Sequence, residues 1–505
     1  ARVNDIKTLS GSFAVSDRPW RRAVLPSLLA GILLAGPAVA QDERVSLPSM
    51  GDPADQILSP ARERELGEAF MRQVGDRLQI LEDPLLSDYL FGLGARLITA
   101  SQHTGVTFTF FFVNDATINA FAAPGGFIGV NSGLMLATTS ESQLAGVLAH
   151  EVAHVTQRHI ARAYAASQTS SLPTAAAILA AILLGGTNPQ ASQAAIATGI
   201  ATTQQLQLNY TRANEYEADR LGIRYLARAQ FNPSGMVDFF DLLERRNAAD
   251  GISPPEYLST HPLSSNRVAE ARSRAQALTT SDQRADSMTF QLARARLQVL
   301  TTTDPTRLRA TIDRELESAR GIERQIQAYT AALLAYRTGK YGRAAELLQE
   351  LNEIDPDNIF YNVLSARNVF ALGRSAEGKA KFEQLLQLYP SNVPVLLAYA
   401  EASEEQGDVN HAARALREAL QLPGYHLLMT YRALARIEDK RDRPVESLES
   451  LAEYHALSGQ TRLAINQLEQ ALKRTDKASD QALRIAARLQ QLRDQFAERL
   501  RERGG

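Results

Sequence analysis

A 34-residue repeat dominates the second half of this 505-residue sequence and limits what that half can fold into. Its period is typical of tetratricopeptide repeats, in which each unit is a pair of antiparallel helices. A generic helical bundle would not repeat in this way, so we predict an array that binds peptides or partner proteins. The positions that recur, with Pro423 one residue out of step, are Gly339, Gly373 and Gly407; Pro356, Pro390 and Pro423; Ala332, Ala366 and Ala400; and Leu348, Phe382 and Leu416.

Three repeats begin near Gln325, Ile359 and Val393, and a fourth match follows only after extra residues. We interpret the excess as one additional helix near Leu427–Lys440. A charged final helix would cap the open end of the array. The segments predicted for this half are therefore a helical linker at 276–324, tetratricopeptide repeats with one extra helix at 325–478, and a C-terminal capping helix at 479–505.

The first half, residues 41–275, mixes helical patterns with β-rich segments. Val106–Val113 is rich in β-branched and aromatic residues and predicts a strand. A turn at Ala123–Gly126 is followed by a second predicted strand at Phe127–Asn131. We expect an α+β domain, mostly helical with a small sheet.

The N-terminus has the pattern of an export signal. Three arginines precede an apolar run from Ala23 to Gly36, and Ala38–Ala40 supplies the small residues that signal peptidase requires. We predict a cleavable signal peptide at 1–40, a mature start near Gln41 and a bacterial periplasmic location. The alternative is an uncleaved membrane anchor, although the run is shorter than the roughly 20 residues of a membrane span.

Composition excludes several classes of function. The chain has no cysteine, so it can contain neither a disulfide nor a thiolate metal site, and any transition metal must be held by His, Asp and Glu. The formal net charge of −2 gives no electrostatic basis for binding nucleic acid.

The most informative motif is HExxH, at His150–His154. Ser140 followed by Gln143 predicts a helix start just before it. His150 and His154 are four residues apart and therefore share one helix face, where both imidazoles can reach one ion. Glu151 stands where a carboxylate can act as general base toward the attacking water. Zinc also requires a third protein ligand.

A second helical motif, from Asn214 to Gly222, offers that ligand. Glu215 and Asp219 share one face, so Glu215 can complete a zinc site while Asp219 orients a ligand imidazole or assists proton transfer. Glu217 points elsewhere and is interpreted as a surface carboxylate paired with an arginine.

HExxH followed by this ExxxD resembles the HtpX/Oma-type gluzincin metallopeptidases. The resemblance implies a zincin-like domain with one Zn²⁺ per chain, Glu215 as third ligand and Asp219 as proton donor. With the export signal and the repeats, nearly the whole mature chain is similar to the periplasmic protease–chaperone group of that family. The family's strand beside the cleft pairs with extended substrate and corresponds here to Phe127, Ile128, Gly129, Val130 and Asn131.

The same resemblance implies a regulatory role for His261, within Thr260-His261-Pro262. Its family counterpart can occupy the fourth zinc position and hold the enzyme latent; the alternative is an ordinary surface-loop histidine. Arg267 would stabilise charge near the cleft. The remaining histidines show no partner pattern and are interpreted as structural: His103, His159, His411, His426 and His455.

We therefore predict a zinc-dependent endopeptidase acting on misassembled outer-membrane proteins, with the repeats contacting the β-barrel assembly machinery. The competing hypothesis is a chaperone or assembly scaffold whose peptidase is largely silent. Residues 174–201 contain two short apolar arms around a glycine break. They predict either a mobile hairpin that covers the cleft or touches membrane transiently, or plain core helices.

Overall fold

The computed structural model describes residues 58–75, 78–162, 212–250, 255–278 and 284–504. The predicted signal peptide at 1–40, the mature start at Gln41 and the apolar segment at 174–201 lie outside these ranges. Within them, no helix combines the length and the apolar character needed to cross a membrane.

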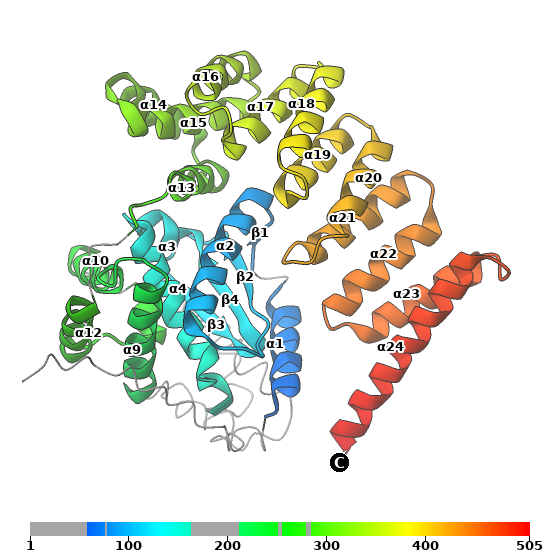
Figure 1. Cartoon of the computed structure of the whole chain (residues 1–505), viewed down its shortest axis with the longest axis horizontal. Helices are drawn as coiled ribbons and strands as arrows, with labels where there is room; N and C mark the ends of the chain where they lie inside the picture. The colour runs from blue at the N-terminus through cyan, green and yellow to red at the C-terminus, as the bar shows by residue number, and fades with distance from the viewer. Residues whose placement is uncertain (1–57, 76–77, 163–211, 251–254, 279–283, 505) are drawn as a thin grey trace, which may run out of the picture. The chain divides into compact units, whose positions relative to one another are not determined.

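A small mixed sheet forms the centre of the first half (Figure 1). Its strands are β1 (Ile80–Leu81), β2 (Thr109–Val113), β3 (Ala120–Ala123) and β4 (Phe127–Asn131), in the order β1-β2-β4-β3. β2 and β4 are parallel, whereas β1 pairs with β2 and β3 pairs with β4 in antiparallel fashion.

The position of β4 corrects the prediction that Phe127–Asn131 pairs with substrate. β4 is hydrogen-bonded to β2 along its whole length and to β3 on its other side. A strand with both edges paired has no backbone groups left for another chain. Among the described strands, β3 pairs only with β4, so the edge on this side of the sheet belongs to Ala120–Ala123.

Helices cover the sheet and bury the HExxH segment. α1 (Pro60–Gly75), α2 (Pro84–Ser101) and α3 (Ser132–Ala137) precede α4 (Glu141–Thr156), in which every residue is buried. The Ser140 hydroxyl accepts from the Gln143 amide at 3.2 Å, so the predicted N-cap forms. Further helices follow in chain order: α9 (Arg212–Arg228), α10 (Gly235–Asp250), α11 (Tyr257–Thr260) and α12 (Ser265–Leu278).

Two glycines allow α4, α9 and α10 to approach closely. A Cβ at Gly222 of α9 would lie 3.2 Å from the His150 nitrogen of α4, and one at Gly146 of α4 would lie 2.9 Å from the Met236 backbone of α10. The α9 backbone can therefore pack directly against the residues that carry the metal-binding histidines.

The second half is an array of helix pairs of tetratricopeptide type, as the 34-residue period predicts (Figure 1). Glycines in the left-handed region, with φ from 71° to 77°, end the first helix in four of the pairs; only glycine adopts this conformation without strain. The helices are α13 (Met288–Thr301), α14 (Pro305–Ser318), α15 (Gly321–Arg337), α16 (Tyr341–Ile354), α17 (Ile359–Ala371), α18 (Ser375–Leu388), α19 (Val393–Glu405), α20 (Val409–Ala419), α21 (Leu427–Lys440), α22 (Pro444–Leu457), α23 (Thr461–Arg474) and α24 (Asp480–Gly504).

A buried ion pair joins the helices of the two halves. Asp83 caps the N-terminus of α2 by accepting from the Leu86 amide at 3.0 Å. Its carboxylate also receives two hydrogen bonds from Arg296 of α13, at 2.8 and 2.7 Å. Arg296 donates in addition to the Tyr329 hydroxyl of α15 at 3.2 Å. The predicted linker region thus contributes α13 to the core.

Candidate metal centre

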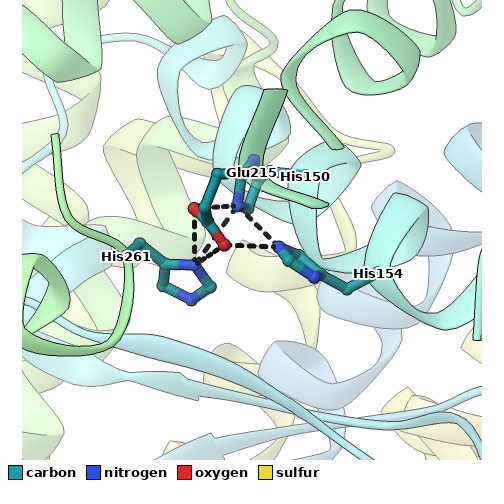
Figure 2. Close-up of side chains that lie close together, drawn as sticks. All are labelled: His150, His154, Glu215 and His261. Atoms are coloured by element: carbon teal, nitrogen blue, oxygen red, sulfur yellow. Dashed lines mark hydrogen bonds and ion pairs between the residues drawn. The ribbon is translucent and has the colours of Figure 1, made fainter. Parts of the chain in front are cut away.

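Four side chains from three parts of the chain meet in one buried cluster (Figure 2). α4 supplies His150 and His154, the first turn of α9 supplies Glu215, and the residue that follows α11 is His261. Each side chain is at most 3% exposed. One ligand atom from each lies within 4.8 Å of the others.

The spacing of most of these atoms is close to that of the donors around a tetrahedral zinc ion. Bonds of about 2.0–2.1 Å to a central ion place neighbouring ligand atoms about 3.3–3.4 Å apart. His150 Nε2 lies 2.9 Å from His154 Nε2 and 3.3 Å from His261 Nδ1. Glu215 lies 3.4 Å from His154 Nε2 and 3.2 Å from His261 Nδ1. Three imidazoles and one carboxylate are a donor set that zinc prefers.

Charge in the cluster is concentrated around His150 and Glu215. Burial acts to lower the pKa of His150, but the neighbouring Asp219 and Glu215 carboxylates raise it to about 10. Burial likewise acts to raise the pKa of Glu215, yet His261 and the two α4 histidines hold it well below its usual value. Without metal, the site therefore favours one imidazolium beside an ionised carboxylate, and a bound cation would take the place of that proton.

Glu151 lies beside the cluster without being one of the four donors. It is 1% exposed, and its Oε1 is 3.5 Å from His261 Nε2. Burial raises the pKa of Glu151, while His261, His150 and a backbone hydrogen bond from Ala122 oppose the rise. A carboxylate with a raised pKa beside the metal donors is suited to accepting a proton near neutral pH.

Asp219 and Arg267 form a second layer behind the donors. Asp219 Oδ1 lies 3.0 Å from His150 Nδ1, the nitrogen that faces away from the cluster. Arg267, 2% exposed, donates to both oxygens of Asp219, contacts Glu215 at 2.9 Å and donates to the Pro262 carbonyl at 2.8 Å. Burial acts to raise the pKa of Asp219, but His150 and Arg267 lower it. An ionised carboxylate is therefore held beside His150 Nδ1, the position from which a carboxylate can orient a ligand imidazole.

His261 is held over the cluster by its own short helix. Its backbone amide donates to the Tyr257 carbonyl at 2.8 Å, and its ring stacks on the Tyr257 ring with centroids 4.6 Å apart. Tyr257 packs in turn against Phe239 of α10. The Tyr257 amide donates to the Ile118 carbonyl, two residues before β3, at 3.2 Å. The imidazole therefore faces both the metal donors and Glu151.

His159 is the site residue that sequence analysis missed. Its sequence context predicts only a structural role, yet its Nδ1 lies 2.8 Å from His154 Nδ1 and its ring is 0% exposed. Its Nε2 lies 3.1 Å from Glu217, which pairs with Arg162 at 3.0 Å. Helical periodicity gives no signal for this contact, because a continuous helix turns about 140° over five residues.

Comparisons with known proteins agree with this geometry. Residues 85–275 match the model of peptidase family M48. The beta-barrel assembly-enhancing protease of Escherichia coli (strain K12) is 35% identical over 494 residues, which cover 96% of this chain and 99% of that protein. This chain belongs to peptidase family M48.

Other relatives match smaller shares of this chain. The putative beta-barrel assembly-enhancing protease of Vibrio cholerae serotype O1 is 38% identical over 330 residues, 64% of this chain and 67% of that protein. The mitochondrial metalloendopeptidase OMA1 of Schizosaccharomyces pombe is 32% identical over 200 residues, 39% of this chain and 55% of that protein. The chain is an M48 metallopeptidase with a buried site for one zinc ion, followed by a helical repeat domain.

Proposed function

We propose that this M48 peptidase is a zinc-dependent endopeptidase of the periplasm that acts on misassembled outer-membrane proteins. The observation that carries the proposal is the convergence of His150, His154, Glu215 and His261 beside the buried carboxylate of Glu151. The role in outer-membrane assembly is supported by the 35% identity to the beta-barrel assembly-enhancing protease over 96% of the chain. Cleavage of an unfolded β-barrel protein by the purified chain tests the substrate class.

In the proposed reaction, the residues of the chain hold the metal, transfer protons and orient a metal ligand. His150, His154 and Glu215 hold the metal, and Glu151 takes a proton from the attacking water and delivers it to the leaving amine. Bound zinc supplies a Lewis acid that polarises the scissile carbonyl. Asp219 keeps His150 in its ligand orientation rather than serving as proton donor, because both of its oxygens accept from Arg267.

We assign substrate pairing to β3 rather than β4. In an antiparallel pair the hydrogen-bonded positions alternate. The Asn131 amide donates to the Asn119 carbonyl, so the backbone groups of Ala120 and Ala122 point away from β4. The Ala122 amide reaches Glu151, which places this edge beside the catalytic carboxylate. Ala120–Ala123 are at most 3% exposed, so an extended substrate must first displace what covers them.

The resting enzyme is proposed to be latent. His261 fills the fourth donor position and also contacts Glu151, so substrate and His261 compete for one place. The short helix α11, which precedes His261, contacts the segment before β3 through a hydrogen bond from Tyr257 to Ile118. Withdrawal of α11 together with His261 would therefore free both the donor position and the adjoining strand edge.

The decisive test of the peptidase is Glu151→Gln. The variant should retain one zinc per chain, because Glu151 is not among the donors, while cleavage falls by about 10²–10⁴-fold with the loss of a general base. Zinc content and cleavage of an unfolded β-barrel protein are measured side by side. Retained cleavage in the variant would reject the mechanism.

The competing function is a chaperone or assembly scaffold with a largely silent peptidase, and the contact of His261 with the donors and Glu151 favours it. Complementation of an envelope defect separates the two. Rescue by Glu151→Gln as complete as that by wild type would favour the scaffold, and loss of rescue would favour the peptidase.

The repeat domain is the proposed binding surface for clients and for the β-barrel assembly machinery, since such arrays present extended concave surfaces. Photo-crosslinking from repeat residues in cells would test it, and labelling confined to unrelated proteins would count against it. For the periplasmic location, sequencing the mature N-terminus distinguishes cleavage before Gln41 from a retained anchor.

A further inference from the structure

A chain of polar side chains leads from the metal ligand His154 toward the surface. His154 directs Nε2 at the cluster, where it lies 2.9 Å from His150 Nε2. Its other nitrogen, Nδ1, lies 2.8 Å from His159 Nδ1. His159 Nε2 lies 3.1 Å from Glu217 Oε2, and the same oxygen accepts from Arg162 Nη2 at 3.0 Å. We call these three residues behind His154, namely His159, Glu217 and Arg162, the His159 relay.

A local break in the helix makes the relay possible. α4 ends at Thr156, and Arg158 adopts the left-handed conformation with φ of 52° before helical backbone resumes at His159. Such a conformation costs about 1 kcal/mol or more for a residue with a Cβ. Arg158 is anchored by a 3.0 Å ion pair with Glu63 of α1. The turn returns His159 to the ring of His154, with ring centroids 4.7 Å apart.

The donors and acceptors of the relay allow only one arrangement of protons once His154 binds a metal. Nε2 of His154 must then be unprotonated, so Nδ1 carries the proton and donates to His159 Nδ1. His159 must accept there, which places its own proton on Nε2. The carboxylate of Glu217 accepts a hydrogen bond from this Nε2–H group, and Arg162 keeps the carboxylate ionised. Each group thus fixes the tautomer of the one before it.

We infer that His159 and Glu217 are positioning residues, which hold His154 in the tautomer and ring orientation that a zinc ligand requires. Partners behind a ligating histidine fix its tautomer and raise its basicity, and their loss typically costs 10–100-fold in metal affinity. The two ligand histidines of α4 are supported differently. His150 contacts a buried carboxylate directly, whereas His154 is supported through a neutral imidazole by Glu217, whose side chain is 38% exposed.

The inference rests on the proposed zinc site, so its test measures zinc binding separately from cleavage. The full mature chain is stripped of metal, and its zinc dissociation constant is determined by competition with a chromogenic chelator. The variants are His159→Phe, which keeps an aromatic ring without an acceptor, His159→Gln, which restores an acceptor, and Glu217→Gln. The matched control is Glu270→Gln, a carboxylate that pairs with Arg220 of α9 at 2.6 Å and is 30% exposed.

The expected result is a zinc dissociation constant raised about 10–100-fold in His159→Phe. The rise should be smaller in Glu217→Gln, partly reversed in His159→Gln and absent in Glu270→Gln. The unfolding midpoint of the metal-free protein reports whether a variant is folded. A folded His159→Phe that binds zinc within about twofold of wild type would overturn the inference. Should that variant fail to fold, wild-type affinity in both Glu217→Gln and His159→Gln would overturn it equally.

The outcomes also separate this inference from the proposed function. In one outcome, wild type binds zinc tightly and cleaves the substrate while the relay variants bind zinc with unchanged affinity. That result would support the proposed peptidase and reject the relay. Weakened zinc binding in the relay variants of a protein that cleaves no β-barrel substrate would support the relay and count against the proposed function.

Discussion

Arg267 donates two hydrogen bonds to Asp219, from Nε to Oδ2 at 2.8 Å and from Nη2 to Oδ1 at 2.9 Å. Both residues are almost fully buried, and Asp219 in turn lies 3.0 Å from His150 Nδ1. Buried pairs of this bidentate kind have little freedom to rearrange. The sequence left two roles open for Asp219, orientation of a ligand and donation of a proton, and this geometry favours orientation.

Asp219→Asn is expected to weaken zinc binding about 10–100-fold, because an amide beside Arg267 cannot hold His150 as a carboxylate does. Chelator competition measures the affinity, and kcat is then determined at saturating zinc. Arg220→Gln, an exposed position on the same helix, is the control. Unchanged zinc affinity combined with a collapsed kcat would instead identify Asp219 as the proton donor.

His261→Ala is expected to raise cleavage of a general unfolded substrate by about 10-fold, which corresponds to removing a closed state favoured by about 1.4 kcal/mol. The reason is that His261 contacts both the donor cluster and Glu151. Initial rates with excess zinc are the measurement, and His103→Ala, a half-buried histidine outside the cluster, is the control. An inactive variant that has also lost zinc would show that His261 is a required ligand.

Sequence patterns predicted the parts of the fold that depend on local spacing. The 34-residue period identified the helix pairs because a turn glycine such as Gly373, at φ of 77°, recurs at the same position of successive repeats. The residue pattern at Phe127–Asn131 also predicts a strand, but it does not predict the place of that strand in the sheet. Strand order depends on pairing between distant segments, and a strand buried on both sides reads alike at the centre and at the edge.

The residues of the site also divide into those that local spacing predicts and those that depend on tertiary contacts. His150 and His154 follow from helical spacing, and Glu215 from a second helix of matching pattern. His159 could not be found like this, since its contact with His154 depends on one left-handed residue, Arg158. Nor does spacing indicate that Arg267 donates two hydrogen bonds to Asp219 while it also contacts Glu215.

Ala120→Pro is expected to impair substrate binding if β3 is the pairing edge. Proline removes the outward amide of Ala120 while leaving the hydrogen bonds to β4 in place. In a His261→Ala background, loss of one backbone hydrogen bond should raise KM up to about 10-fold. Ala120→Gly in the same background keeps the amide and serves as control. Equal KM values for the two double variants would exclude pairing at this position.

The ion pair between Asp83 and Arg296 yields a prediction about stability and pH. Burial acts to raise the pKa of Asp83, but the Arg296 guanidinium outweighs burial and holds the pKa below its ordinary value. A carboxylate whose pKa is lower in the folded than in the unfolded protein contributes its full stabilisation at pH values above the unfolded-state pKa. This contribution is lost as the pH falls through the folded-state pKa. The pair should therefore contribute its full stability from neutral pH down to about pH 4.

Asp83→Asn should destabilise the protein by about 3 kcal/mol at pH 7, since it leaves the Arg296 guanidinium, which is 7% exposed, without its carboxylate. Asparagine remains a good N-cap, so the start of α2 is retained. The difference between variant and wild type should stay constant from pH 7 to 5 and shrink below about pH 4. Unfolding midpoints at each pH measure it, with Asp313→Asn, an exposed partner of Arg309, as control. A difference that grows toward low pH would contradict the depressed pKa of Asp83.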